Sequence, residues 1–478
     1  MLTAERKDRM PKPMTAREKH AMMVETPIRR LILRMAVPSI ISMLVTSLYN
    51  MADTYFIGLL NNTSATGAIS VVFPLMTIIQ AVGFTLGHGS GNTLSRALGR
   101  QDGEDAARTA ATGFFLAWIV GVVLAAAGLC FTTPLMRALG STETILPYAV
   151  QYGRYILIGA PWMMASIVLN VQMRFQGNAF FSMIGIATGA VVNIALDPLF
   201  IFVFGMGVSG AAVATVCSQA ISFGLLFSGT FRGGNIRIRF KDFKPEKARL
   251  KAIFLGGLPS LCRQSLGSVA GILMNVAART YGGVTPEAID AAVAAMGIVN
   301  RMMQLCASAI IGIGQGFQPV CGFNYGAKKL DRVRQGFFFT FRLMLGTMLV
   351  ISALGLTVSP FVIGLFSRDQ AVVDFGSLAL RLQCAVFPLQ AIVFATNMTM
   401  QTISLAVPAS VLSMARNGIF FIPMILLLPP LLGALGVQSA QAASDALSFL
   451  LAVPLCLHML RRLRREEAAL AENGKESV

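Results

Sequence analysis

Two acidic residues lie inside stretches that otherwise have the composition of membrane-spanning helices. Asp53 lies in SLYNMADTYFIG (residues 47–58), and Asp197 lies in VVNIALDPLFIF (residues 191–202). An ionised carboxylate is costly in hydrocarbon, so acids at such depths are rare and tend to be functional. Two carboxylates in one dry cavity cannot both ionise cheaply, and they titrate as a unit. The pair therefore predicts a site that exchanges protons or binds Na⁺.

Polar groups at the same predicted depth complete this candidate site. Counting roughly 1.5 Å per residue along each predicted helix places four side chains of the first half of the chain near one level. These four are Asp53, Tyr152, Asp197 and Thr215. Tyr49 lies one helical turn before the first acid, and Asn193 lies one turn before the second, so each shares a face with its acid. Carboxylate, hydroxyl and amide oxygens together suit either H⁺ or Na⁺.

A structural role for the two acids is the alternative. Asp53 could cap toward the outer headgroups, and Asp197 could hydrogen-bond locally before Pro198. Pro38 and Pro198 each remove a backbone hydrogen bond from their helix and create a point at which it can bend. A change of charge at Asp53 could therefore change the shape of its helix.

The elements that must position these residues are long apolar helices. The chain of 478 residues is 55% hydrophobic and 13% charged, and soluble domains carry about 25% charged residues. Stretches long enough to cross a membrane recur from residue 31 to residue 460. The predicted spans are 31–58, 66–96, 108–133, 144–173, 179–204, 208–231, 250–280, 287–322, 334–358, 372–403, 407–430 and 434–460. The fold class is an all-α integral membrane protein with about twelve helices.

Basic residues border these spans. The net charge is +17, and its basic clusters abut the spans, which is the pattern of cytoplasmic loops. Without aromatic platforms or a nucleic-acid-binding fold, the charge is weak support for DNA or RNA. We expect a multi-pass protein of the cytoplasmic membrane with both termini cytoplasmic. Its parts are an amino-terminal tail (1–30), a first lobe (31–231), a basic linker (232–249), a second lobe (250–460) and a carboxyl-terminal tail (461–478).

The two halves of the chain resemble each other. PLMRALGSTET (134–144) aligns with PFVIGLFSRDQ (360–370) without a gap, and Pro161 and Asn170 align with Pro388 and Asn397 at one offset. Two six-helix lobes that both start inside are related by a pseudo-two-fold axis along the membrane normal. Transporters of this build place their site between the halves.

The second lobe carries arginines within its predicted spans. They are Arg263, Arg301, Arg381 and Arg416. They could attract an anionic group of the substrate. Alternatively, Arg416 could pair with Asp445 on the next helix while the others reach backbone carbonyls or the membrane interface.

Other chemistry has little support. No HExxH, GxSxG or paired His/Asp motif appears, so we expect no enzyme, and the isolated histidines predict no metal site. GHGSG (87–91) and GIGQG (312–316) follow no strand, so close helix packing is a better interpretation than phosphate binding. The seven cysteines show no CxxC pair. The 26 methionines suit a pliable drug-binding surface or ordinary core filling. We expect no cofactor other than the coupling ion.

The motifs also carry a family resemblance. LYNMADTYFIG, TGAISVVFPLMTIIQAVGFTLGHGSGNTLSRALGRQD and NIALDPLFIFVFGMGVSGAAVAT resemble the multidrug and toxic compound extrusion (MATE) transporters, over about residues 30–460. The chain is similar to the DinF-like branch. The resemblance implies efflux of organic cations and amphipathic drugs in exchange for H⁺ or Na⁺. It assigns coupling-ion roles to Tyr49, Asp53, Tyr152, Asn193, Asp197 and Thr215. It also implies a helix-bending role for Pro38 and a place in the substrate cleft for Asn170.

One departure from the family narrows the expectation. The NorM-like branch has acids on its seventh and tenth helices, whereas here PSLCRQSLGSVAGILMN and LRLQCAVFPLQAIVFATNM carry none. We therefore expect coupling through the first lobe, amphipathic small-molecule substrates, contact with membrane lipids and a monomer. A lipid-linked precursor flippase of similar build is the alternative. The sequence does not distinguish H⁺ from Na⁺ or name the substrate.

Overall fold

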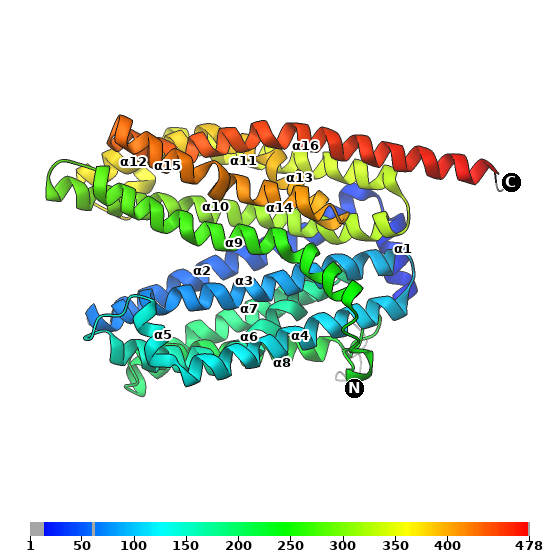
Figure 1. The fold of residues 1–478 in the computed structure, drawn as a ribbon, viewed down its shortest axis with the longest axis horizontal. Helices are drawn as coiled ribbons and strands as arrows, with labels where there is room; N and C mark the ends of the chain where they lie inside the picture. Colours follow the sequence, from blue (N-terminus) through cyan, green and yellow to red (C-terminus); the bar gives the residue numbers. More distant parts are fainter. Residues whose placement is uncertain (1–13, 60–62, 477–478) are drawn as a thin grey trace, which may run out of the picture.

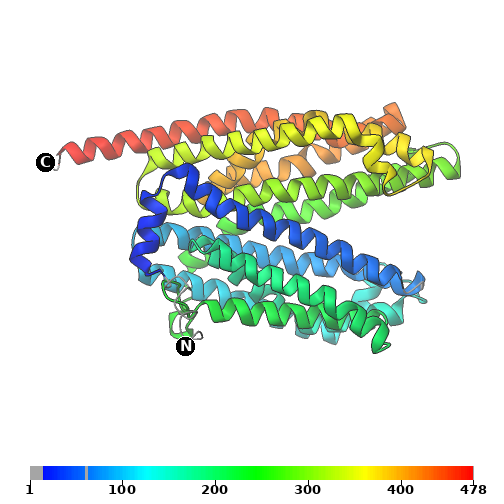
Figure 2. The same ribbon diagram turned by 180° about the vertical axis from the view of Figure 1, so that it is seen from behind.

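The computed structural model describes residues 14–59 and 63–476. The side chains of residues 50, 51, 53–55, 57, 58, 63–66 and 473–476 lie outside the described part. Helices joined by turns and loops make up the described part of the chain, and they form two groups that lie one above the other in Figure 1 and again, from behind, in Figure 2.

The first group follows a short amino-terminal helix. Its elements are α1 (Ala16–Glu25), α2 (Ile28–Gly58), α3 (Thr63–Gly99), α4 (Gly103–Cys130), α5 (Thr132–Ala138), α6 (Leu146–Phe175), α7 (Ala179–Pro198), η1 (Leu199–Val203) and α8 (Val208–Gly229). We call α2–α8 the N-lobe. Its long helices match the first six predicted spans.

The second group begins after a linker with one turn of 3₁₀ helix, η2 (Phe240–Asp242). Its elements are α9 (Lys247–Tyr281), α10 (Pro286–Gly326), α11 (Leu330–Gly364), α12 (Gln370–Val386), η3 (Phe387–Leu389), α13 (Gln390–Thr402), α14 (Ala406–Met414), η4 (Ala415–Ile419), α15 (Phe421–Leu432) and α16 (Ala434–Glu476). We call α9–α16 the C-lobe. Short interruptions join α12 to α13 and α14 to α15, so each pair makes one span.

Eleven described helical segments are long and apolar enough to cross a membrane. The predicted span that is not among these eleven, 250–280, corresponds to α9, which carries several basic residues along its length and packs along α3. The described part of the chain thus forms the expected all-α fold of twelve long helices. Figure 1 shows α1 and the carboxyl-terminal part of α16 at the same end of the molecule, which we call the α1 end.

Local geometry repeats between the lobes. The turn before the last helix of the N-lobe passes through Gly207 at φ +58°, ψ −133°, and the turn before the last helix of the C-lobe passes through Gly433 at φ +58°, ψ −130°. This conformation is strained for any residue with a Cβ, so both turns require glycine. Asn170 donates to the carbonyl of Ser182 at 2.8 Å, and Asn397 donates to a carbonyl at the same sequence separation. The duplication inferred from sequence is therefore visible in backbone and side chains.

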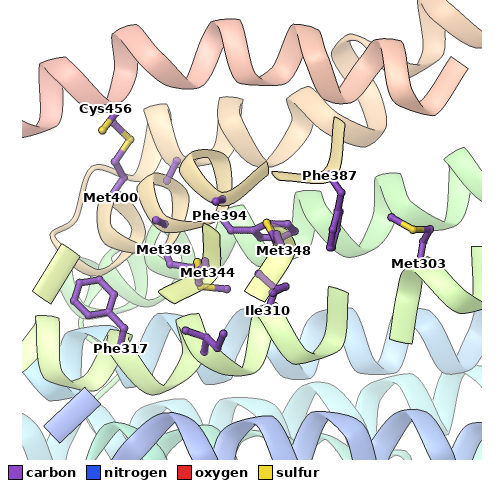
Figure 3. Packing of buried hydrophobic residues seen from close by; sticks show 14 of the residues in the cluster. Met303, Ile310, Phe317, Met344, Met348, Phe387, Phe394, Met398, Met400 and Cys456 are labelled. Carbon is purple, nitrogen blue, oxygen red and sulfur yellow. The ribbon is translucent and has the colours of Figure 1, made fainter. Parts of the chain in front are cut away.

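Methionine and phenylalanine fill the interior of the C-lobe, as Figure 3 shows. Met344 and Met348 of α11 and Met398 and Met400 of α13 are at most 2% exposed and belong to one buried cluster. For these four, ordinary core filling is the correct interpretation. The unbranched thioether adapts to the irregular space between helices that carry glycine and proline.

The short helix α1 bridges the two lobes at its end of the molecule. The ammonium group of Lys19 donates to the Asn235 side chain, which follows α8, and the amide of Asn324 on α10 donates to the carbonyl of Met23 at 3.1 Å. Burial lowers the pKa of Lys19 from 10.5 to about 8. Lys19 and Met23 lie one helical turn apart on α1, so this short helix is bonded to both lobes.

Candidate coupling site and the seam between the lobes

A buried carboxylate, amide and hydroxyl meet between α7 and α8. Asp197, Asn193 and Thr215 are each 0% exposed. The amide nitrogen of Asn193 lies 3.5 Å from Oδ1 of Asp197 and 3.4 Å from Oγ1 of Thr215. Oδ1 of Asn193 is buried and accepts no hydrogen bond from the described residues. An amide oxygen left in that state suits a small cation or a protonated partner.

The backbone beside this cluster departs from α-helix. Pro198 lacks an N–H, and the chain continues as the π-helical turn η1, with Phe204 N donating to the carbonyl of Leu199 at 2.9 Å. Such π turns concentrate at functional sites because they redirect side chains at a cost in backbone regularity. Here the distortion directly follows the acid that the sequence singled out.

The other predicted coupling residues lie on neighbouring helices. Tyr152 of α6 is fully buried, with its hydroxyl 3.9 Å from the sulfur of Met76, and Tyr49 lies on α2. Helix α2 packs along α7, so the helices that carry the two acids are neighbours. Asp53 belongs to α2, but its side chain is outside the described residues. A shared chamber for the two carboxylates therefore stays a prediction.

The remaining two predicted site residues occupy different surroundings. Pro38 lies inside the continuous helix α2, and its carbonyl accepts from Ser42 at 2.9 Å. Asn170 is not part of the Asn193 group. Its amide and carbonyl both bond to Ser182, at 2.8 and 3.0 Å, and these bonds fasten α6 to α7 within the N-lobe. Its predicted role in the substrate cleft stays a prediction.

The buried acid of the C-lobe has a fixed cation beside it. Nε of Arg416 lies 2.9 Å from Oδ1 of Asp445, which is 0% exposed, and Gln441 donates to the same oxygen at 2.9 Å. Arg416 lies in η4, a π turn that matches η1 of the N-lobe. The pairing proposed from sequence is therefore present. The C-lobe acid has a guanidinium beside it, and the amide of Asn193 lies beside Asp197 in the N-lobe.

The other C-lobe arginines differ from one another. Nε of Arg381 donates to the hydroxyl of Ser359 at 2.9 Å rather than to a backbone carbonyl, and Arg301 is exposed. Arg263 is half-buried and makes no hydrogen bond or ion pair with the residues that the structure describes. The structural alternative thus holds for Arg416, whereas Arg381 bonds a side-chain hydroxyl where a backbone carbonyl or the membrane interface was expected.

The lobes meet through glycines on α3 and α9. A Cβ on Gly89 would lie 1.8 Å from the carbonyl oxygen of Ile253, and a Cβ on Gly257 would lie 1.9 Å from that of Thr85. The two backbones are therefore in direct contact, as the sequence predicted for GHGSG. These contacts lie in the half of each helix nearer the α1 end.

A second glycine contact joins α2 to α10. Gly312 and Gly316 face the backbone of Ile40 and Ala36, where an added Cβ would come within 2.5 and 2.4 Å of Cα atoms. Both contacts again lie toward the α1 end, and the two groups of ribbons diverge toward the opposite end in Figure 1. The seam between the lobes is closed at the α1 end.

Sequence reasoning missed Arg174, which lies at this seam. It is 1% exposed, and its Nη1 lies 2.5 Å from Oε1 of Gln315 on α10. Arg174 stands one residue beyond the predicted span 144–173, where an arginine at the membrane interface is ordinary. The sequence did offer one signal for Arg174, because it lies one helical turn after Asn170, a predicted site residue.

Two six-helix lobes, a buried polar cluster inside one of them and a seam closed at one end define a multi-pass membrane transporter. A sequence profile of the MatE family matches residues 38–199 and 284–427, and the chain belongs to this family of transporters. Its relatives include the multidrug export protein MepA of Staphylococcus haemolyticus (strain JCSC1435), 28% identical over 454 residues that cover 94% of this chain and 97% of MepA.

Solved structures agree with this assignment. An outward-facing conformation of a multidrug resistance MATE family transporter of the MOP superfamily is 26% identical, with a TM-score of 0.87 over 94% of this chain and 99% of that one. A crystal structure of MATE in the straight conformation matches with the same TM-score, coverage of 94% and 99%, and 25% identity. The twelve-helix fold inferred from sequence is confirmed.

Proposed function

We propose that this protein is an antiporter that expels amphipathic, chiefly cationic, organic compounds across the cytoplasmic membrane in exchange for H⁺ or Na⁺. Homology to multidrug export proteins supports the export of drugs. The observation that carries ion coupling is the fully buried cluster of Asp197, Asn193 and Thr215, in which an amide oxygen has no donor among the described residues. The C-lobe acid Asp445 pairs with Arg416, and this pairing of the C-lobe acid supports coupling through the N-lobe.

The proposed cycle follows from competition between two ligands. Binding of the ion at Asp53 and Asp197 from outside bends or shifts α2 about Pro38 and expels the substrate. Release of the ion inside resets the helix. A ligand shifts a conformational equilibrium only by its difference in affinity between the two states, so ion and substrate must favour different conformations. With both termini cytoplasmic, the closed α1 end faces the cytoplasm and the described conformation is outward-facing.

Ethidium efflux from cells tests this proposal. Asp53→Asn should abolish efflux while leaving the amount of protein in the membrane unchanged, because the amide keeps the size of the side chain and removes its titratable charge. Asp290→Asn, which alters an exposed carboxylate at the start of α10, is the matched control and should export ethidium normally. Normal extrusion by Asp53→Asn would end the proposal. A lipid-linked precursor flippase should leave ethidium untouched.

A further inference from the structure

The guanidinium of Arg174 is buried without an acidic partner. One of its nitrogens donates to Gln315 across the seam, whereas Nε and Nη2 are buried and have no acceptor among the described residues. No carboxylate in the described part of the chain lies within ion-pair distance of it. Removing an unpaired charge from water is expensive, and a neutral amide oxygen offsets little of that cost. The guanidinium of Arg174 therefore lacks the anionic acceptor that would offset this cost.

Buried polar side chains also lie on α3, the helix that packs along α6 and therefore beside Arg174. The ring of His88 on α3 is 2% exposed and lies edge-on to Phe175, the residue after Arg174. Asn92, one turn after His88, is 0% exposed, and neither of its amide atoms has a partner among the described residues. The helix next to Arg174 thus carries a buried amide whose hydrogen bonds are unmet.

The chemistry of these groups selects a negative ligand. Guanidinium presents a planar fork of N–H donors that matches the paired oxygens of a carboxylate, sulfonate or phosphate. A simple organic cation would meet repulsion from the positive charge of Arg174 at this place. An acidic group would complete the hydrogen bonds that Arg174 lacks.

Arg174 lies in the closed part of the seam, so a ligand can reach it only after the lobes separate there. Its contact with Gln315 joins α6 to α10, so separation of the lobes at the α1 end must break that contact. The guanidinium then becomes accessible to a compound that enters from this end.

We propose that Arg174 is an entry site for the acidic group of an amphipathic substrate, so that the transported compounds include organic anions and zwitterions. The inference rests on the transport function proposed above and extends its substrate class. Substrates with both a cationic and an acidic group can meet the N-lobe acids and Arg174 in turn.

Two dyes that share a xanthene ring system and differ in charge test the site. Carboxyfluorescein is an anion and rhodamine 6G is a cation, and binding of each to the full-length protein in phosphatidylcholine nanodiscs is measured by fluorescence polarisation. The variants are Arg174→Met and Arg174→Lys. Arg279→Met removes a charge from an exposed arginine at the end of α9 and is the matched control.

Wild type and Arg279→Met should bind carboxyfluorescein equally. Arg174→Met should bind it about tenfold more weakly or worse, as expected for loss of hydrogen bonds to a charged group. Arg174→Lys should lie between them because it keeps the charge and loses the fork. Rhodamine 6G should not follow this order, and its retained binding shows that each variant is folded.

Failure of wild type to bind carboxyfluorescein, or unchanged affinity in folded Arg174→Met, would overturn the anion site. If Arg174→Met does not fold, unchanged affinity in Arg174→Lys overturns it instead. Failure of wild type to bind rhodamine 6G would contradict the proposed drug export rather than the anion site. Titration of phosphatidylglycerol into the nanodiscs identifies the source of the ligand. Displacement of carboxyfluorescein supports a lipid phosphate at the site, and lack of displacement supports a water-soluble acid.

Discussion

The glycine contact between α3 and α9 predicts a strong effect of a single methyl group. A Cβ on Gly257 would lie 1.9 Å from the carbonyl oxygen of Thr85, whereas ordinary contacts of this kind begin at 3.4 Å. In Gly257→Ala the two helices must therefore separate by about 1.5 Å, and overpacking of this kind costs about 1–3 kcal/mol. The cost falls only on the conformation in which the α1 end is closed. The population of that conformation should drop by about 5- to 150-fold relative to the conformation open at that end.

Hydrogen–deuterium exchange of α3 and α9 peptides, measured beside ethidium efflux, tests this shift. Gly271→Ala on the same helix is the matched control, because an added Cβ there has no atom within 4 Å. Both substitutions gain similar helix propensity, up to about 1 kcal/mol, so the comparison isolates the contact. Gly257→Ala should speed exchange in peptides around residues 85 and 257 and slow efflux. Equal exchange and equal efflux in the two variants would refute the closed seam.

Three further substitutions probe other contacts. Arg416→Met leaves the buried carboxylate of Asp445 without its cation and should lower the free energy of unfolding by about 3–5 kcal/mol; thermal unfolding should show most of this loss recovered when Asp445→Leu is added. Asn170→Ala should destabilise the protein by about 1–3 kcal/mol, since its bonds to Ser182 are lost, and should reduce efflux of all dyes alike; a selective effect on one dye would instead support a place in the cleft. The pKa of Lys19 is about 8 when α1 is docked against the lobes, and it is 10.5 for the free side chain. Between these two pH values, protonation of Lys19 therefore favours release of α1 from the lobes. Docking of α1 should strengthen as pH rises from about 8 to 10.5 and stay constant below 8; limited proteolysis of α1 should follow this trend in wild type and lose it in Lys19→Met.

The sequence predicted the elements of the fold well because a bilayer constrains them one helix at a time. A helix that crosses hydrocarbon needs about 20 apolar residues, and this requirement located the spans without knowledge of their partners. Even α9 (Lys247–Tyr281), with its basic residues, was predicted as the apolar span 250–280. The pair of Arg416 and Asp445 was also accessible, since the two residues lie on consecutive helices of one lobe.

Contacts between the lobes were harder to predict. Which helices of separate lobes face each other is set by tertiary packing, and hydropathy carries no record of it. Arg174 therefore looked like an ordinary residue at the end of a span, although it is buried against Gln315. Asn170 was singled out by its type and depth, and the sequence did not reveal that it bonds to Ser182 on a neighbouring helix of its own lobe. Its predicted place in the cleft stays a prediction.

Dye efflux from reconstituted vesicles, with pH and Na⁺ gradients imposed separately, tests most directly whether the Asp197 cluster couples ion entry to export. Wild type should export dye faster under one of the two gradients. Asp197→Asn should bind dye and lose this response, because its side chain can no longer exchange a charge. Gradient-driven efflux by Asp197→Asn at the wild-type rate would contradict the account.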